Sequence, residues 1–250
     1  MQTQFTRTQR ILGENSMNIL KNARIAVFGI GGVGGFVCEA LVRSGVGAFD
    51  LIDNDTVSVT NINRQIIATH RTVGRFKTEV MRERMIEINP DADIRIHTKF
   101  FLHENAGEFP FEEYDYVVDA VDTVAAKLEI ATICSEKEIP LISSMGTGNK
   151  IEASALKVAD IKDTKMCPLA KVMRKELRKR GISTLKVVYS EEIPMRSKQQ
   201  EAEENISSVD ACSCAGKRDV PGSVAFVPST AGMIIAGEVV KALTGMSGSF

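Results

Sequence analysis

A glycine-rich turn and an acidic residue placed after it are the first features of this chain that could do chemistry. Gly29, Gly31 and Gly34 form a G-x-G-x-x-G pattern between an apolar run and a helical one. Such glycines let the backbone turn sharply and approach a phosphate, which then meets the positive end of the helix. Asp53 stands about 20 residues further on, where an acid binds ribose hydroxyls. The pattern predicts a nucleotide site, and a purely structural glycine turn is the alternative.

A polar stretch just beyond Asp53, VTNINRQ at 59–65, does not suit the simplest interpretation of that motif. A nicotinamide enzyme needs a flat pocket for its second ring and gains nothing from cations beside the first ribose. In this chain an arginine and a lysine follow the acid. Two cations close to one nucleotide would stabilise the negative charge of a triphosphate and of the pyrophosphate that leaves it. The predicted nucleotide-binding side chains are therefore Asn61, Arg64, Gln65 and Lys77. The alternative is that the charges are solvated and the asparagines cap helices.

Two carboxylates, Asp119 and Asp122, close the apolar run YDYVVDAVD. They fall at the carboxyl end of a predicted strand, which is the edge where ligands of such sheets bind. A carboxylate there can hold Mg²⁺ against phosphates. Asp122 lies nearer the strand end and is our choice for the metal. Asp119 could instead cap or pair structurally.

The elements that must position these residues alternate between strand and helix over the first 150 residues. Strands are expected at 23–30, 47–53, 93–100, 114–122 and 139–145, and helices at 33–44, 74–88 and 124–137. This alternation predicts an α/β fold, a Rossmann-like doubly wound sheet that is mainly parallel in its N-terminal half. After residue 146 the predicted strands and helices no longer alternate regularly. Further strands at 152–161, 185–192 and 222–228 are expected to extend the sheet in mixed orientation.

We therefore expect a single nucleotide-binding domain over 1–250, with a nucleotide-binding half at 1–150 and a substrate-facing half at 151–250. Within the second half, the polar segment 194–221 is expected to be a flexible loop, because structureless stretches of that length are usually lids or disordered. A terminal helix at 231–243 is expected to pack on the body, since Glu238 and Lys241 interrupt its apolar run.

Composition restricts the class of protein. A net charge of −1 exerts no strong general pull on nucleic acid or anionic lipid, so any such contact must use a local patch. The first residues lack the pattern of a signal peptide, and no stretch has the roughly 18 or more apolar residues of a membrane span. The five cysteines form no evenly spaced framework. A cytoplasmic location without a membrane is therefore expected.

The motifs FGIGGVGG, DLIDNDTVSVTNINRQ, GRFK and VVDAVDT together resemble the ubiquitin-activating-enzyme-like (ThiF/MoeB/HesA) adenylating superfamily. The resemblance covers residues 5 to about 150 and implies Mg-ATP and transfer of AMP to a carboxylate. It assigns Asp53 to the ribose and Asp122 to Mg²⁺. It assigns the phosphates to Asn61, Arg64 and Lys77. It also implies a homodimer in which an N-terminal arginine reaches the partner's ATP. Arg10 fits that role best, with Arg7 second.

Cysteine spacing separates branches of that superfamily. Relatives that activate sulfur carriers usually hold a structural zinc with two C-x-x-C pairs, whereas this chain has only Cys212 and Cys214 one residue apart. Two such thiolates cannot complete a tetrahedral site. Zinc is therefore not expected. Cys134 and Cys167 stand alone, and whether any of these thiols is functional stays open; for Cys167, a small packed residue before a proline is favoured over a nucleophile.

The second half resembles the tRNA threonylcarbamoyladenosine dehydratase family, through residues 143–182 and the KVVYSEEIP that follows. The resemblance implies adenylation of the threonyl carboxylate and ring closure by the substrate's own urea, with tRNA as the substrate. A sulfur-transfer protein is a further possible partner. The first alternative is adenylation of the C-terminal glycine of a ubiquitin-like sulfur carrier. The second alternative is a nucleotide-binding scaffold without turnover, and the third is a nicotinamide oxidoreductase.

A basic helix is predicted within this second half at 171–181. Leu169, Val172, Met173 and Leu177 have helical spacing and are expected to face inward. The predicted tRNA-binding cations on the outer surface are Lys171, Arg174, Lys175, Arg178 and Lys179. Because the whole chain is almost neutral, a local basic face suits a tRNA substrate. An ordinary solvated face is the alternative.

Overall fold

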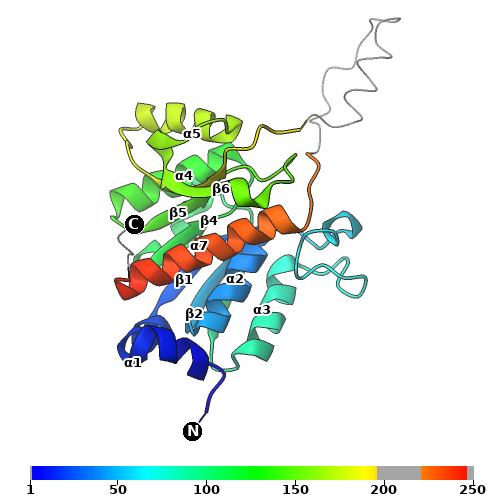
Figure 1. The fold of residues 1–250 in the computed structure, drawn as a ribbon, viewed down its shortest axis with the longest axis vertical. Coiled ribbons are helices and arrows are strands. Elements are labelled where there is room, and N and C mark those ends of the chain that lie inside the picture. The colour runs from blue at the N-terminus through cyan, green and yellow to red at the C-terminus, as the bar shows by residue number, and fades with distance from the viewer. Residues whose placement is uncertain (1, 196–220, 247–250) are drawn as a thin grey trace, which may run out of the picture.

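The computed structural model describes residues 2–195 and 221–246, arranged as in Figure 1. The segment 194–221 lies almost wholly outside the described residues, as do Cys212 and Cys214. Seven strands of the described chain form one sheet in the order β3-β2-β1-β4-β5-β7-β6. The strands are β1 (Arg24–Phe28), β2 (Ala48–Ile52), β3 (Asp93–His97), β4 (Tyr116–Asp119), β5 (Leu141–Ser144), β6 (Leu156–Asp160) and β7 (Lys186–Ser190).

The strand directions confirm the predicted fold class. All neighbours are parallel except β6 and β7, which pair antiparallel at the edge contributed by the second half of the chain. Each strand expected between residues 23 and 192 is present within its expected range. The chain winds from β1 outward through β2 to β3, and then restarts at β4 on the other side of β1. The carboxyl ends of β1 and β4 therefore form a topological switch point, where such sheets bind ligands.

Helices cover both faces of the sheet (Figure 1). They are α1 (Thr6–Asn22), α2 (Gly34–Ser44), α3 (Lys77–Ile88), α4 (Val124–Glu136), α5 (Pro168–Lys179) and α7 (Phe226–Thr244). Short 3-10 helices are η1 (Val59–Asn61), η2 (His103–Glu108), η3 (Phe111–Glu113), η4 (Ala153–Ala155) and η5 (Ile161–Asp163). Strand β1 alternates between the two faces. Ile25 and Val27 join the core under α2 and α7, whereas Ala26 and Phe28 join the core under α4.

Two features differ from expectation. The strand predicted at 222–228 is wrong, because residues from Phe226 onward begin α7. Valine and phenylalanine beside a proline suggested a strand, but Pro228 lies in the first helical turn, where the missing N–H is not needed. Helix α1 was not expected. Gly13, at φ 81°, interrupts its helical geometry and so obscures the periodicity.

Helix α7 confirms the prediction of a packed terminal helix. Length and apolar composition alone would let it cross a membrane, a test that core helices of soluble proteins also pass. Here it lies along α2, and Val227, Ile235 and Val239 are fully buried. The contact is close, because a Cβ atom on Gly232 would lie 2.5 Å from the carbonyl oxygen of Val33.

A buried carboxylate links the first three strands. Asp50 in β2 is fully buried and accepts hydrogen bonds from Arg24 Nη1 at 2.8 Å and from His97 Nε2 at 2.7 Å. The hydroxyl of Tyr114 donates to the same carboxylate at 3.2 Å. Burial by itself raises the pKa of Asp50, but the hydrogen bonds and charges of His97 and Arg24 outweigh it and lower the pKa. The ionised form is thus the one that the fold stabilises.

This cluster predicts a pH dependence of stability. Asp50→Asn should lower the free energy of unfolding at pH 7 by about 3 kcal/mol, because one partner of a buried ion pair is lost. A depressed folded-state pKa contributes stability above the unfolded value of about 3.9 and loses it as the pH falls through the folded value. The difference between the two proteins should therefore shrink between about pH 5 and pH 3.

Urea unfolding at several pH values measures both proteins. Asp91→Asn, at an exposed aspartate, serves as the control and should change little. A difference that stays constant down to pH 3 would show that the ionised carboxylate of Asp50 is not what stabilises the strands.

Candidate active site

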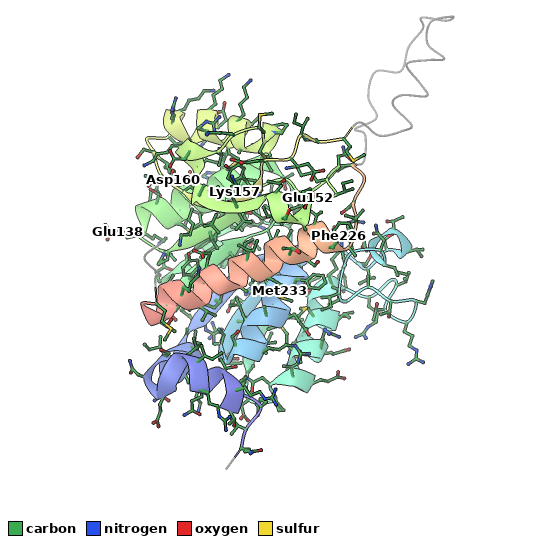
Figure 2. All side chains as sticks on the ribbon, in the orientation of Figure 1. Glu138, Glu152, Lys157, Asp160, Phe226 and Met233 are labelled. Carbon is green, nitrogen blue, oxygen red and sulfur yellow. The ribbon has the colours of Figure 1, made fainter. Side chains whose placement is uncertain are left out.

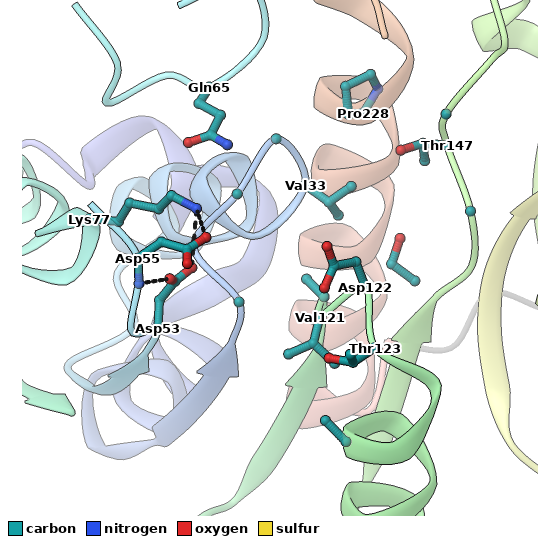
Figure 3. A pocket seen from close by; sticks show the side chains of 18 of the residues that line it. Val33, Asp53, Asp55, Gln65, Lys77, Val121, Asp122, Thr123, Thr147 and Pro228 are labelled. Carbon is teal, nitrogen blue, oxygen red and sulfur yellow. Dashed lines mark hydrogen bonds and ion pairs between the residues drawn. The ribbon is translucent and has the colours of Figure 1, made fainter. Parts of the chain in front are cut away.

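A cavity of about 680 Å³ lies over the switch point. Its walls come from the glycine turn after β1, the residues after β2, the loop before α3, the residues after β4 and those after β5. The N-terminal part of α7 closes one side through Pro228. In Figure 3, Asp53, Asp55 and Lys77 lie on one side and Asp122 and Thr147 on the other. The cavity therefore brings together segments from both halves of the chain.

Glycine suits each of the three positions in the turn for a different structural reason. Gly29 has φ 88°, and a Cβ atom there would lie 2.7 Å from the carbonyl oxygen of Ala120. A Cβ atom on Gly34 would lie 1.8 Å from the carbonyl oxygen of Gly29, so only glycine lets α2 start this close to β1. Gly31 borders the cavity, and a Cβ atom there would meet only Gln65 Nε2 at 3.8 Å. The protein itself leaves space at Gly31, which suits close approach of a ligand to the backbone.

Asp53 is held against the glycine turn. Its Oδ2 accepts the backbone N–H of Ile30 at 2.7 Å, and its Oδ1 accepts that of Asp55 at 2.8 Å. Burial raises the pKa of Asp53, and the nearby Lys77 together with these two N–H donors lowers it by less. The carboxylate thus has a fixed position at the floor of the cavity, next to the turn that a nucleotide would contact.

Lys77 is the first residue of α3, and its side chain lies beside Asp53. Its side chain is 7% exposed, and Nζ lies 2.7 Å from Asp55 Oδ2 and 3.9 Å from Asp53 Oδ2. Asp55 was not among the predicted site residues. Its spacing of two residues from Asp53 after a strand is the signal that could have identified it. In this arrangement Asp55 compensates the ammonium group that the sequence assigned to phosphates.

Residues of the NINR stretch form hydrogen bonds within the loop, and some of them also line the cavity. Asn61 Oδ1 accepts the N–H of Ser58 at 3.0 Å and so caps η1, as the alternative interpretation foresaw. Arg64 Nη1 donates to the Thr60 carbonyl at 2.9 Å and to Asn63 Oδ1 at 2.9 Å. Asn61, Arg64 and Gln65 all line the cavity.

Gln65 carries an unusual polar atom. Its Oε1 is buried and has no hydrogen-bond partner within the described residues. Buried polar atoms are nearly always paired, so this atom, in a residue that lines the cavity, fits a hydrogen bond to a ligand there. Either orientation of the amide, which can be flipped, offers a hydrogen-bonding group to a nucleotide.

The two aspartates after β4 have separate roles. Asp122 is exposed in the cavity, and Figure 3 shows its carboxylate between Val33 and Thr123. Asp119 is 1% exposed and forms an ion pair with Lys127 at 2.9 Å, which matches the structural alternative for Asp119. The described residues contain no group of three or more His, Cys, Asp or Glu side chains that could hold a metal. A single carboxylate nevertheless fits Mg²⁺, which keeps waters and takes most ligands from phosphates.

The remaining predicted residues lie away from the cavity. Arg10 and Arg7 are on α1, which packs at the C-terminal end of α2, where a Cβ atom on Gly45 would lie 2.7 Å from Met17 Cε. The other end of α2 is at the cavity, and 11 helical residues span about 16 Å. Neither arginine is among the residues that line the cavity of its own chain.

The basic helix α5 begins at the cavity wall, which Leu169 lines, and extends away from it. Nitrogen-tipped side chains project from it in Figure 2. Lys171, Lys175 and Arg178 are exposed. Arg174 is half-buried, and its Nη1 donates to the Thr164 carbonyl at 2.9 Å, whereas Lys179 pairs with Glu176 at 2.8 Å. The predicted basic face of α5 is thus present, but the guanidinium group of Arg174 stabilises the segment before α5 by its hydrogen bond to Thr164. Of the residues expected to face inward, Met173 and Leu177 are buried, whereas Val172 is 46% exposed.

The described cysteines are buried. Burial raises the pKa of Cys134 to about 12 and also raises that of Cys38, so both thiols stay protonated near neutral pH. Cys167 is 5% exposed and precedes the first residue of α5. This burial matches the interpretation of Cys167 as a small packed residue.

Comparison with known proteins agrees with this geometry. The family model described as ThiF family matches residues 3–249. The tRNA threonylcarbamoyladenosine dehydratase of Bacillus subtilis (strain 168) is 41% identical over 241 residues, covering 96% of this chain and 94% of that relative. The protein of the same name from Escherichia coli (strain K12) is 40% identical over 174 residues, covering 70% of this chain and 65% of that relative.

Solved structures give the same result. The crystal structure of the E. coli tRNA N6-threonylcarbamoyladenosine dehydratase, TcdA, in complex with ATP has a TM-score of 0.85 and 31% sequence identity, covering 98% of this chain and 95% of that one. The structure of E. coli MccB with ATP has a TM-score of 0.67 at 20% identity and shows the fold alone. On the match of the family model over nearly its whole length, the chain belongs to the ThiF family.

Proposed function

We propose that this protein is an ATP-dependent dehydratase that closes the threonylcarbamoyl group of N6-threonylcarbamoyladenosine in tRNA into a ring. The observation that carries the proposal is the set of groups around one cavity. A glycine turn, an acid, two cations and an opposing carboxylate line it. Two relatives at 41% and 40% identity bear the name of this activity, and a related structure holds ATP.

The chemistry follows from what loss of water requires. A carboxylate oxygen of the threonyl group attacks the α-phosphorus of ATP, and the bond to pyrophosphate breaks. An atom of the substrate's own urea then attacks the activated carbonyl, and the bond to AMP breaks. Because both groups belong to one molecule, the second step is effectively unimolecular and its barrier is lower by several kcal/mol. No protein thioester is needed, in keeping with the buried thiols of Cys38 and Cys134.

Each cavity residue has a place in this scheme. Asp53 would bind the ribose hydroxyls, while Arg64 and Lys77 would stabilise the negative charge that develops as pyrophosphate leaves. Asn61 and Gln65 would donate to phosphate oxygens. Asp122 would hold Mg²⁺, which supplies a positive charge that neutralises the phosphates of the nucleotide.

Several further features belong to the same proposal. The buried free thiols of Cys38, Cys134 and Cys167 suit a reducing compartment, so we place the protein in the cytoplasm without a membrane. We treat 1–250 as a single adenylation domain whose residues 1–150 bind nucleotide and whose residues 151–250 face the substrate. A sulfur-transfer protein remains a possible further partner. Adenylation of a sulfur-carrier protein is not favoured, since the dehydratase relatives match the chain most extensively.

The proposal predicts the effect of removing Lys77. Lys77→Ala should still bind AMP but should lose ATP–pyrophosphate exchange, because the ammonium acts on charge that develops as pyrophosphate departs. Loss of such a group costs on the order of 3 kcal/mol in the barrier, or about a hundredfold in rate. Exchange is measured with the substrate tRNA present, and AMP binding by calorimetry.

Arg82→Ala provides the matched control, since Arg82 is an exposed cation on the same helix and does not line the cavity. It should exchange pyrophosphate at nearly the normal rate. Near-normal exchange by Lys77→Ala would remove Lys77 from the reaction.

We also propose a homodimer in which Arg10 completes the ATP site of the other protomer. The position of α1 at the far end of α2 supports this, because it keeps Arg10 from its own cavity. Mixing Arg10→Ala with Asp122→Ala should therefore restore activity to two inactive proteins. Each mixed dimer would contain one site with both an intact Asp122 and an intact Arg10.

Activity of the mixture is measured after subunit exchange has been verified with two affinity tags. Mixing either variant with more of itself is the control. Verified mixed dimers without activity would contradict the placement of Arg10 in the partner's site, and the same experiment with Arg7→Ala then tests the second choice.

We propose that α5 binds phosphates of the tRNA. Lys171, Lys175 and Arg178 follow one another at helical spacing along a stripe that starts near the cavity. Replacing all three by alanine should weaken tRNA binding without changing ATP affinity. Each phosphate contact contributes about 0.7 to 0.9 to the slope of log K against log salt, so the slope should fall by about 2 to 3. Binding is measured at several salt concentrations.

A charge-matched control carries alanine at Lys21, Arg82 and Lys137, which are exposed on other elements. It should leave the slope nearly unchanged. An unchanged slope for the α5 variant would make this helix an ordinary solvated face.

A further inference from the structure

A lysine ammonium group is buried directly behind the cavity. Lys127 is 1% exposed, and its Nζ donates to Asp119 Oδ2 at 2.9 Å and to the Ser144 carbonyl at 2.7 Å. The hydroxyl of Ser143 lies 3.3 Å from the same Nζ and itself donates to Asp119 Oδ2. Every hydrogen bond of this ammonium group thus goes to the end of β4 or the end of β5.

Neither the helix nor the ion pair explains why a lysine occupies this position. Lys127 lies in the first turn of α4, where its N–H bonds to the Thr123 carbonyl. A positive charge near a helix N-terminus is unfavourable, because that end already carries partial positive charge. A buried ion pair also contributes little net stability compared with apolar residues of similar volume. The presence of a lysine here is therefore explained by the groups that its ammonium group connects.

The groups that Lys127 joins continue into two segments on the same side of the cavity. Asp119 Oδ1 accepts the N–H of Val121 at 3.2 Å, and so fixes the turn that carries Asp122. Ser144 begins the segment 144–148, which lines the cavity next to Leu169. Sheet pairing of β4 with β5 ends at Asp119 and Ser143. Beyond that pair, Lys127 links the two segments through Asp119 and the Ser144 carbonyl.

We propose that Lys127 is a positioning residue that holds Asp122 and the segment 144–148 at a fixed separation along one side of the cavity. The ammonium group does not line the cavity and so does not touch the nucleotide. Its catalytic consequence rests on the proposed function, because only there does Asp122 act on the Mg-nucleotide. The structural part of the proposal, coupling of the two segments through one ammonium group, is independent of that function.

The test compares Lys127→Met with the unmutated protein. Amide hydrogen exchange, measured without any ligand, should become at least about tenfold faster at residues 120–123 and 144–148, with β1 and α2 unchanged. With substrate present, kcat should fall about 100-fold, which corresponds to about 2.7 kcal/mol, while KM for ATP stays within about threefold. The Mg²⁺ concentration for half-maximal rate should rise.

Ile130→Ala is the control for a general loss of stability, since Ile130 is fully buried on the same helix and belongs to an apolar cluster rather than to the ion pair. It should leave exchange at the two segments and kcat nearly unchanged at a temperature well below its melting point. If both variants change exchange and kcat alike, Lys127 is merely part of the core and the proposal is overturned.

A second variant keeps the test decisive if Lys127→Met does not fold. Ser143→Ala removes one hydroxyl of the cluster and keeps the ion pair, so it should speed exchange at the same two segments by a smaller factor. Unchanged exchange there would contradict the coupling. Absence of pyrophosphate exchange in the unmutated protein would instead refute the proposed function and leave the ligand-free measurement unaffected.

Discussion

The close approach of α2 to the end of β1 is the constraint on which the rest of the site depends. A Cβ atom on Gly34 would lie 1.8 Å from the Gly29 carbonyl oxygen, so no other residue permits this approach. The approach brings the start of α2, which is the positive end of its helix dipole, to the edge of the sheet. Asp53 then bonds to the turn through Ile30, which ties the end of β2 to the same point. The cavity forms where these segments meet the end of β4.

Charge is distributed in this cavity in a way that suits a bound polyphosphate. Lys77 is buried and compensated by Asp55 and, more distantly, by Asp53. The ammonium group of Lys77 can therefore interact with a bound phosphate and still have an anionic partner before the nucleotide binds and after it leaves. Asp122 lies on the opposite side, away from these pairs, and is the residue that would hold Mg²⁺ in the proposed reaction. In the proposed reaction, the two sides of the cavity would thus contact different parts of one Mg-nucleotide.

The parts of this arrangement that could be predicted from sequence are those encoded locally. The glycine pattern, its distance to Asp53, and the acid at the end of β4 depend on neighbours within one strand–turn–helix unit. The roles of Lys127 and Asp55 could not be predicted in this way, because their partners are set by how separate strands end side by side. Arg174 shows the same limit: helical spacing placed it on the basic face, but a contact with Thr164 determines what its guanidinium does. At 222–228, local β-propensity was overridden by packing of α7 on α2.

In the proposed reaction, the cavity couples ATP cleavage to loss of water from a modified tRNA nucleoside. The direct measurement is mass analysis of nucleosides from tRNA that carries N6-threonylcarbamoyladenosine, treated with the protein, ATP and Mg²⁺ and handled so that a cyclic product is not hydrolysed. The nucleoside should lose the mass of one water, with one AMP and one pyrophosphate formed for each product. Formation of AMP without any change in the nucleoside, or loss of water without ATP, would contradict this coupling.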